Sequence, residues 1–208
     1  MSSIIISCQF LIFSHLKRVL CVEYLGVPLI SSRLVYRDCK ELIDKVRSRV
    51  HDWKNKSLSA AGRLQLIRSV IGFMHICWAL VFILPSRILL EIEQLMRGFL
   101  WCQGHMRKGK AKVAWDVMCV PKKEGGLGIR KLDVFNKALM ISHIWNLLSL
   151  KESLWVKWIH AYKIRGRSFW SIPFRGNMTW GWRKILQLRP LIWKFIWYKV
   201  GNGDSIYA

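Results

Sequence analysis

The acidic residues of this 208-residue chain are few and scattered. Joining a nucleotide to a growing strand requires carboxylates clustered around two divalent metal ions, which stabilise the attacking and leaving oxygens. The six aspartates are isolated from one another, and a loose acidic pair such as Glu91 and Glu93 would point to different faces of a helix. We therefore expect no polymerase or ribonuclease H activity from this chain alone.

Histidine, cysteine and glycine patterns also fail to indicate a catalytic or metal site. The cysteines include no pair two to four residues apart, which argues against a zinc knuckle and favours reduced, mostly buried thiols. The string GGLGIRKL lacks the spacing of a phosphate-binding P-loop and is more typical of a turn. We assign no catalytic residue, no metal ligand and no cofactor. The cysteines are Cys8, Cys21, Cys39, Cys77, Cys102 and Cys119.

Lysine and arginine dominate the charge of the chain. There are 34 Lys and Arg against 12 Asp and Glu, a formal charge of +22, and residues 101–208 hold 20 of the basic and 5 of the acidic residues. A compact body with this charge repels itself unless a polyanion neutralises it. The excess favours nucleic acid as a partner, with a diffuse solvated basic surface as the alternative.

Two basic stretches are candidates for phosphate contacts that do not read sequence. The first lies among glycine-rich turns, and the second is interleaved with Tyr162, Phe169 and Trp170. Aromatic rings beside cations can stack on bases, although filling a core is the more common role of tryptophan. The candidate residues are Arg107, Lys108, Lys110, Lys112, Lys122, Lys123, Arg130 and Lys131 in the first stretch, and Lys163, Arg165 and Arg167 in the second.

Apolar periodicity predicts a mainly α fold in the first half of the chain. The first helix should span 37–53, and the second should begin after the N-cap Ser59 and stop before Pro85. A third should end near Trp101. The buried faces should carry Leu42, Val46, Val50 and Trp53 in the first helix, Leu66, Val70, Phe73 and Cys77 in the second, and Ile88, Ile92, Leu95 and Phe99 in the third.

The sequence of the second half predicts shorter and less regular elements than that of the first half. Residues 113–120 should form a strand or an extended loop before the glycines. Asp133 should be the N-cap of a fourth helix, followed by shorter helices at 152–163, 180–188 and 190–198 and by a hairpin turn at the C-terminal end. The face of the fourth helix should carry Ala138, Ile141, Trp145 and Leu148.

The run from Val70 to Leu84 has no Lys, Arg, Asp or Glu over fifteen residues. A membrane span requires roughly 20 apolar residues, so a buried core helix is favoured and a membrane segment is the alternative. We accordingly expect a nuclear or cytoplasmic protein rather than a membrane protein.

Several ordered strings resemble the polymerase polyproteins of plant LINE-type (non-LTR) retrotransposons, over about residues 24–208. In that family this region follows the catalytic palm and precedes a Cys/His-rich zinc-binding domain. The Tyr-x-Asp-Asp string of the palm is absent here, so no catalytic residue carries over. The strings are YLGVPL at 24–29, the pattern W-x-x-K-x-L-S-x-A-G-R-x-x-L-I-x-S-V at 53–70, FLW at 99–101, KVAWDVMCVPKKEGGLGIRKL at 112–132, SLWVKW at 153–158, SFWSI at 168–172 and VGNGDS at 200–205.

The resemblance implies a helical thumb-like region that grips a template–primer duplex. We expect a divergent segment over 1–23, the thumb-like region over 24–103, a basic connector over 104–132, and a Trp-rich helical region over 133–208 that ends in a short β-hairpin. The expected function is noncatalytic binding of RNA or an RNA–DNA duplex. The alternatives are a small membrane-associated protein anchored by residues 70–84 and a degenerate remnant without function.

Overall fold

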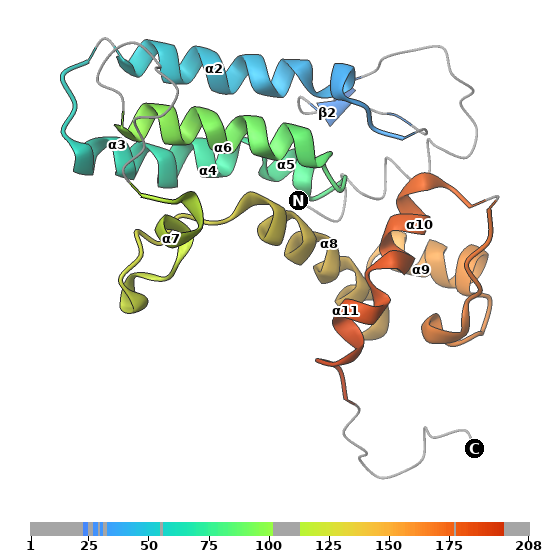
Figure 1. The fold of residues 1–208 in the computed structure, drawn as a ribbon. Helices are drawn as coiled ribbons and strands as arrows, with labels where there is room; N and C mark the ends of the chain where they lie inside the picture. Colours follow the sequence, from blue (N-terminus) through green and yellow to red (C-terminus); the bar gives the residue numbers. More distant parts are fainter. Residues whose placement is uncertain are drawn as a thin grey trace.

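A computed structural model describes residues 23–24, 27–28, 30, 33–54, 56–101, 113–176 and 178–197. The mainly α fold is confirmed (Figure 1). Within these residues, strand is limited to one antiparallel pair, β1 (Glu23–Tyr24) and β2 (Val27–Pro28). The expected C-terminal hairpin and residues 104–112 of the connector lie outside the described residues, and the domain boundaries stay a prediction.

Two long helices, α2 (Lys40–Lys54) and α6 (Ser86–Trp101), lie side by side and form the first layer of the fold (Figure 1). A short 3-10 turn, η1 (Tyr36–Cys39), precedes α2. Both helices bury the faces that their apolar spacing predicts, with Val46 and Ile92 fully buried. The predicted first and third helices are therefore confirmed.

The segment after Ser59 is helical but interrupted. Ser59 is confirmed as the N-cap, because its Oγ accepts a hydrogen bond from the Gly62 amide at 3.2 Å. The chain then passes through several short elements that lie beneath α2 and α6 (Figure 1). They are α3 (Ala60–Leu66), the π-helical turn η2 (Ile67–Ile71), α4 (Gly72–Met74) and α5 (Ile76–Ala79).

The buried face predicted for this segment is wrong. Phe73 is 53% exposed and Cys77 is exposed, whereas Ile67, Ile71 and His75 are fully buried. The physical reason is the π turn, whose hydrogen bonds span an extra residue and shift every following side chain around the helix axis. The core stripe therefore continues at a spacing of four residues, and Leu66 and Val70 are only half-buried.

The predicted strand or extended loop at 113–120 is also wrong. A short helix, α7 (Trp115–Cys119), forms there because Trp115 and Met118, three residues apart, both enter the first core. A 3-10 turn, η3 (Lys122–Glu124), follows. Hydrogen bonds from the Leu127 and Gly128 amides to the Met118 and Val120 carbonyls then fold the chain back beside α7.

Helix α8 (Leu132–Leu148) connects two hydrophobic cores (Figure 1). Its N-cap is Lys131 rather than the predicted Asp133, which lies in the first turn. The predicted face is also wrong, because Ala138 and Trp145 are exposed and Ile141 and Leu148 are half-buried. This helix carries apolar residues on all of its sides, so the apolar periodicity alone does not indicate which side is buried. The buried residues are Leu132, Asn136, Met140, His143, Ile144 and Leu147.

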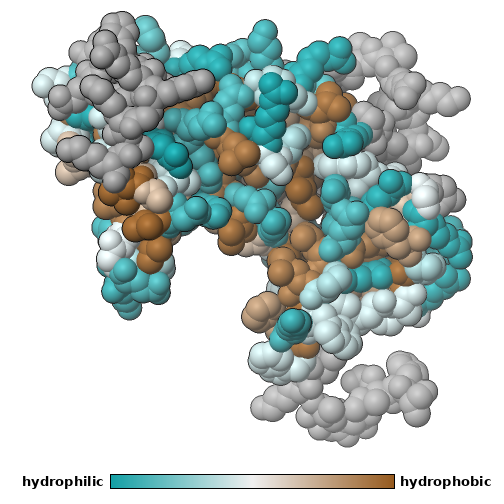
Figure 2. Space-filling model, viewed as in Figure 1, coloured by the Kyte–Doolittle hydropathy of each residue, from teal (hydrophilic) through white to brown (hydrophobic). Residues whose placement is uncertain are grey.

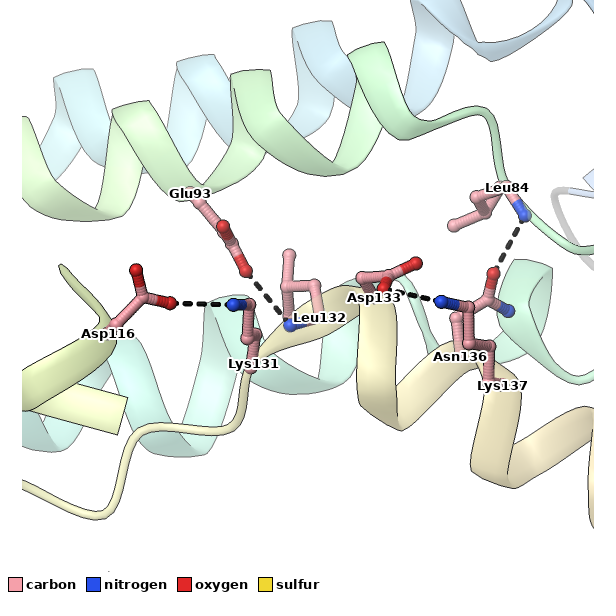
Figure 3. Close-up of polar contacts among 8 residues, drawn as sticks. All are labelled: Leu84, Glu93, Asp116, Lys131, Leu132, Asp133, Asn136 and Lys137. Atoms are coloured by element: carbon pink, nitrogen blue, oxygen red, sulfur yellow. Dashed lines mark hydrogen bonds and ion pairs between the residues drawn. The ribbon is translucent and has the colours of Figure 1, made fainter. Parts of the chain in front are cut away.

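Three polar side chains join α8 to α5 and α6. The Asn136 amide accepts a hydrogen bond from the Leu84 N–H at 2.8 Å and donates to the Ala79 and Phe82 carbonyls at 3.1 and 2.9 Å. His143 contacts the Leu80 carbonyl through Nε2 at 2.7 Å. Glu93 of α6 accepts from the Leu132 N–H at 2.9 Å and so caps the start of α8 (Figure 3).

The second core is built from short helices rich in tryptophan. Trp78, Trp115, Trp155 and Trp182 are buried, five tryptophans are half-buried, and three are exposed, so most tryptophans fill the cores as expected. The predicted short helices are found as α9 (Leu154–Ile159) with the π turn η4 (His160–Ile164), α10 (Trp180–Gln187) and α11 (Arg189–Trp193), although α11 ends before the predicted end at 198. A 3-10 turn that was not predicted, η5 (Phe169–Ser171), lies between η4 and α10.

The apolar run at 70–84 is divided between η2, α4, α5 and the extended residues before α6. Across the part of the chain that the structure describes, no helix combines the length and the apolar character needed to cross a bilayer.

The interrupted helix yields a paired prediction on stability. Ile71→Asp places a charge at a fully buried position and should unfold the protein or cost several kcal/mol of unfolding free energy. Phe73→Asp, at a largely exposed position two residues away, should cost less than about 1 kcal/mol. Circular dichroism during urea unfolding measures both, and equal losses would contradict the phase shift at the π turn.

The junction of α8 yields a second prediction. Asn136→Ala leaves one buried amide and two carbonyls without their side-chain partners, so it should lower the unfolding free energy by about 2–4 kcal/mol. Asn146→Ala, at a half-buried position on the same helix, is the matched control and should cost less than about 1 kcal/mol. Similar losses in urea unfolding would show that Asn136 does not anchor α8.

Candidate nucleic-acid interface

The structure describes seven of the eleven residues proposed to contact phosphate. Arg107, Lys108, Lys110 and Lys112 lie outside the described residues. The fold has two lobes, one around each hydrophobic core, and α8 lies between them (Figure 1). The other seven residues fall into two groups, one beside α7 in the first lobe and one beside α9 in the second. The tertiary structure therefore does not unite the two stretches into one cluster.

Lys122 and Lys123 lie in η3, in a turn that projects from the first lobe and ends in a hydrophilic tip (Figure 2). Both side chains are exposed. Gly125 closes the turn at a φ of 87°, in the left-handed region that glycine tolerates best. A Cβ built on Gly128 would lie 3.3 Å from the Lys122 Cγ, so the stem of Lys122 crosses this glycine closely.

Lys131 and Arg130 already have partners within the chain. The Lys131 Nζ lies 2.6 Å from the Asp116 Oδ1, an exposed ion pair that joins α7 to the start of α8 (Figure 3). The hydrogen bond and the charge of Asp116 raise the pKa of Lys131, and Lys131 lowers the pKa of Asp116 in the same way. The Arg130 guanidinium lies over the rings of Phe135 and Phe73, at 4.7 and 5.7 Å from their centroids.

The second group lies where η4 ends. Arg165 adopts a left-handed conformation with a φ of 52°, and its Nε donates to the Tyr162 carbonyl at 3.1 Å. Lys163 lies 5.7 Å from the Trp158 ring centroid, and Trp158 packs against Tyr162 at 5.5 Å. Tyr162 is 60% exposed and Arg167 is exposed, so cations and an accessible aromatic ring share this surface.

The expected interleaving with Phe169 and Trp170 is only partly realised. Phe169 is buried and packs against Trp182, and Trp170 packs against Trp193 at 4.8 Å. Arg189 lies over Phe169 at 4.8 Å and donates to the Ile172 carbonyl at 2.6 Å. These two aromatic residues therefore serve the second core.

Sequence reasoning missed a pocket of about 290 Å³ between η2 and the chain around Gly128. Arg68, Phe73 and Arg130 are among its lining residues. Periodicity placed Phe73 in the core and gave Arg68 no role, because it could not detect the π turn. The one sequence signal was the string GGLGIR, whose glycines bring the chain back toward η2.

Ionisable groups other than lysine and arginine do not form a reactive cluster in the described ranges, where no three His, Cys, Asp or Glu side chains are placed to hold a metal ion. Burial raises the pKa of Cys39 to about 12, and burial with the nearby charge of Glu93 raises the pKa of Cys119 to about 11. Both thiols are therefore protonated at neutral pH. Cys77 is exposed, whereas we expected most of the thiols to be buried.

His75 is fully buried and packs edge-on against Phe135, with ring centroids 6.1 Å apart. Burial lowers the pKa of His75 to about 4, and the positive charge of Arg130 contributes in the same direction. Burial also lowers the pKa of His143, although its contact with the Leu80 carbonyl opposes this shift. Both histidines are therefore neutral in the folded protein at pH 7.

Comparison with known proteins gives two plant relatives, and no family model matches the chain. The chain is 36% identical over 185 residues to an Arabidopsis thaliana protein named "Putative ribonuclease H protein", a match that covers 86% of this chain and 30% of that protein. It is 24% identical over 123 residues to an Arabidopsis thaliana protein named "Uncharacterized mitochondrial protein", covering 59% of this chain and 80% of that protein. The chain thus spans less than a third of the first relative.

The buried histidines yield a prediction on pH. The pKa of His75 is lower in the folded protein than the value near 6.5 of an unfolded chain, so its contribution to stability is present above pH 6.5 and is lost as the pH falls toward 4. His75→Leu should reduce this acid-induced loss of unfolding free energy by up to about 3 kcal/mol. Urea unfolding at pH 7 and pH 4.5 measures it, and the exposed His51→Leu variant, the control, should behave like the parent protein.

Proposed function

We propose that this chain is a noncatalytic piece of a plant LINE-type retrotransposon polyprotein, from the region after the reverse transcriptase palm, and that it binds the backbone of nucleic acid. The ordered strings at 24–205 support this origin. The relative named for ribonuclease H supports it as well, because that protein is about three times as long as this chain. In the retrotransposon family that the sequence resembles, a ribonuclease H-like domain often lies downstream of this region.

The observation that carries the binding proposal is the set of exposed cations without carboxylate partners. Residues 113–197 contain four carboxylates, Asp116, Glu124, Asp133 and Glu152, and two of them form ion pairs with Lys131 and Lys137. Within the described residues, Lys122, Lys123, Arg165 and Arg167 form no ion pair and are exposed. Cations in this state can neutralise phosphates and release their counterions.

A membrane anchor at 70–84 has less support. This run is divided among short helices, and Trp78 and Ala79 are buried in the first core while Asn136 of α8 bonds to the Ala79 carbonyl. Much of the apolar surface of this run is therefore already packed within the protein, although Phe73 and Cys77 are exposed.

The salt dependence of duplex binding tests the proposal. Lys123, Arg165 and Arg167 are changed together to Gln, while Lys122 is kept because its stem lies against Gly128. If the three cations contact phosphates, the slope of log affinity against log salt for an RNA–DNA duplex should fall by about 2–3, at about 0.9 per phosphate on duplex DNA. Fluorescence polarisation with duplexes of two unrelated sequences should give the same slopes.

The control changes three exposed cations of η1 and α2 that belong to neither basic group, Arg37, Lys40 and Arg49, to Gln. This variant has the same net charge and should keep the parent slope. Equal slopes for both triple variants would indicate that the two basic groups are parts of a diffuse basic surface and not a distinct binding site. No duplex binding by the parent chain at low salt would contradict the proposal and favour a remnant without function.

A further inference from the structure

We propose that the pocket between η2 and the 128–130 segment binds one nucleoside phosphate unit, with the phosphate held by Arg68 and Arg130. The inference rests on the proposed function and deepens it, because it adds a site that takes a single nucleotide to a surface that contacts the backbone. The nucleotide has two possible sources, a free nucleotide or one residue of a strand, and they share the same chemistry.

The charge of the pocket favours an anion. Arg68 comes from the π turn and Arg130 from the chain that follows Gly128, so two guanidinium groups reach one pocket from elements far apart in the sequence. No carboxylate lines the pocket. Neither arginine forms an ion pair among the described residues, and a guanidinium presents paired donors that match the oxygens of a phosphate.

Arg130 is also held in place before any ligand binds. Its guanidinium lies over the Phe135 and Phe73 rings, and Phe135 in turn packs against the buried His75. A cation that is already ordered loses less conformational entropy when it binds an anion. The arrangement therefore favours binding over a freely moving surface arginine.

The size and floor of the pocket favour a nucleotide over a bare phosphate ion. The volume of about 290 Å³ is near the lower end of ordinary small-molecule sites. Ile67 and Met96 form a buried apolar floor, and Phe73 is 53% exposed at the rim. An aromatic ring with an accessible surface is the usual partner for a nucleobase.

The backbone around the pocket depends on two glycines. Gly128 has a φ of 64°, and a Cβ built on Gly72 would lie 3.2 Å from the Ile67 carbonyl oxygen. The π turn that presents Arg68 has a geometry that is uncommon in helices and is often found at functional sites. These features open the pocket at this point of an otherwise packed lobe.

An NMR titration of the full chain with AMP, inorganic phosphate and adenosine tests the proposal. AMP should shift the Gly72 and Gly128 amide signals saturably. Phosphate should shift them more weakly, and adenosine should have little effect because it lacks the anion. Arg68→Gln and Arg130→Gln should each weaken AMP binding about tenfold or more, in line with the loss of a charge-assisted hydrogen bond.

Arg87→Gln is the matched control, since the Arg87 guanidinium lies 4.5 Å from the Tyr36 ring centroid and its loss also removes one charge and one cation–π contact. It should change AMP affinity less than about twofold. Ser69→Phe, at an exposed lining position, should block the pocket without changing the charge. Saturating AMP without shifts at Gly72 and Gly128, or equal effects of Arg87→Gln and Arg130→Gln, would overturn the proposal.

Competition separates the sources and the two proposals. If AMP displaces a fluorescein-labelled single-stranded 12-mer, the pocket takes a nucleotide of a strand; if AMP binds while the 12-mer stays bound, the pocket takes the free nucleotide. Duplex binding that persists without AMP shifts would overturn the pocket and leave the backbone-binding function intact. AMP shifts without any duplex binding would support the pocket and contradict the backbone-binding function.

Discussion

The fold depends on how α8 satisfies backbone groups that would otherwise be buried without partners. The chain between α5 and α6 presents its carbonyls and the Leu84 amide toward the interior, where unpaired groups are costly. Asn136 and His143 satisfy them from α8, and Glu93 satisfies the first amide of α8 in return. Because these bonds fix both the position and the rotation of α8, they also determine how the second core is attached to the first.

The shortage of carboxylates links this architecture to the basic surface. Glu93 is used inside the fold, and Asp116 and Asp133 are used in ion pairs near the start of α8. Few acidic groups are then left to neutralise the lysines and arginines around α7 and η4. Because Glu93, Asp116 and Asp133 already have partners, they do not neutralise the exposed cations around α7 and η4, and this surface is left strongly positive.

Sequence reasoning was accurate where one period held along a whole helix. In α2 and α6 the apolar residues follow a single stripe, so both the helix and its buried face were predicted. The prediction failed at Phe73, because a π turn rotates the following side chains, and at α8, where polar Asn136 and His143 are buried by hydrogen bonding. It also failed at α7, where packing of Trp115 and Met118 overrides the extended preference of the neighbouring valines.

The sequence by itself determined the net charge, the scarcity of acidic residues and their separation along the chain, the positions of most helices and the resemblance to a retrotransposon polyprotein, because these depend on composition and short-range patterns. Only the tertiary structure decided that Lys131 is paired with Asp116 and that Arg68, Phe73 and Arg130 meet at one pocket. Such contacts join residues about 15 to 60 positions apart, and their geometry depends on helix rotation, chain reversal and core packing, which no local pattern encodes.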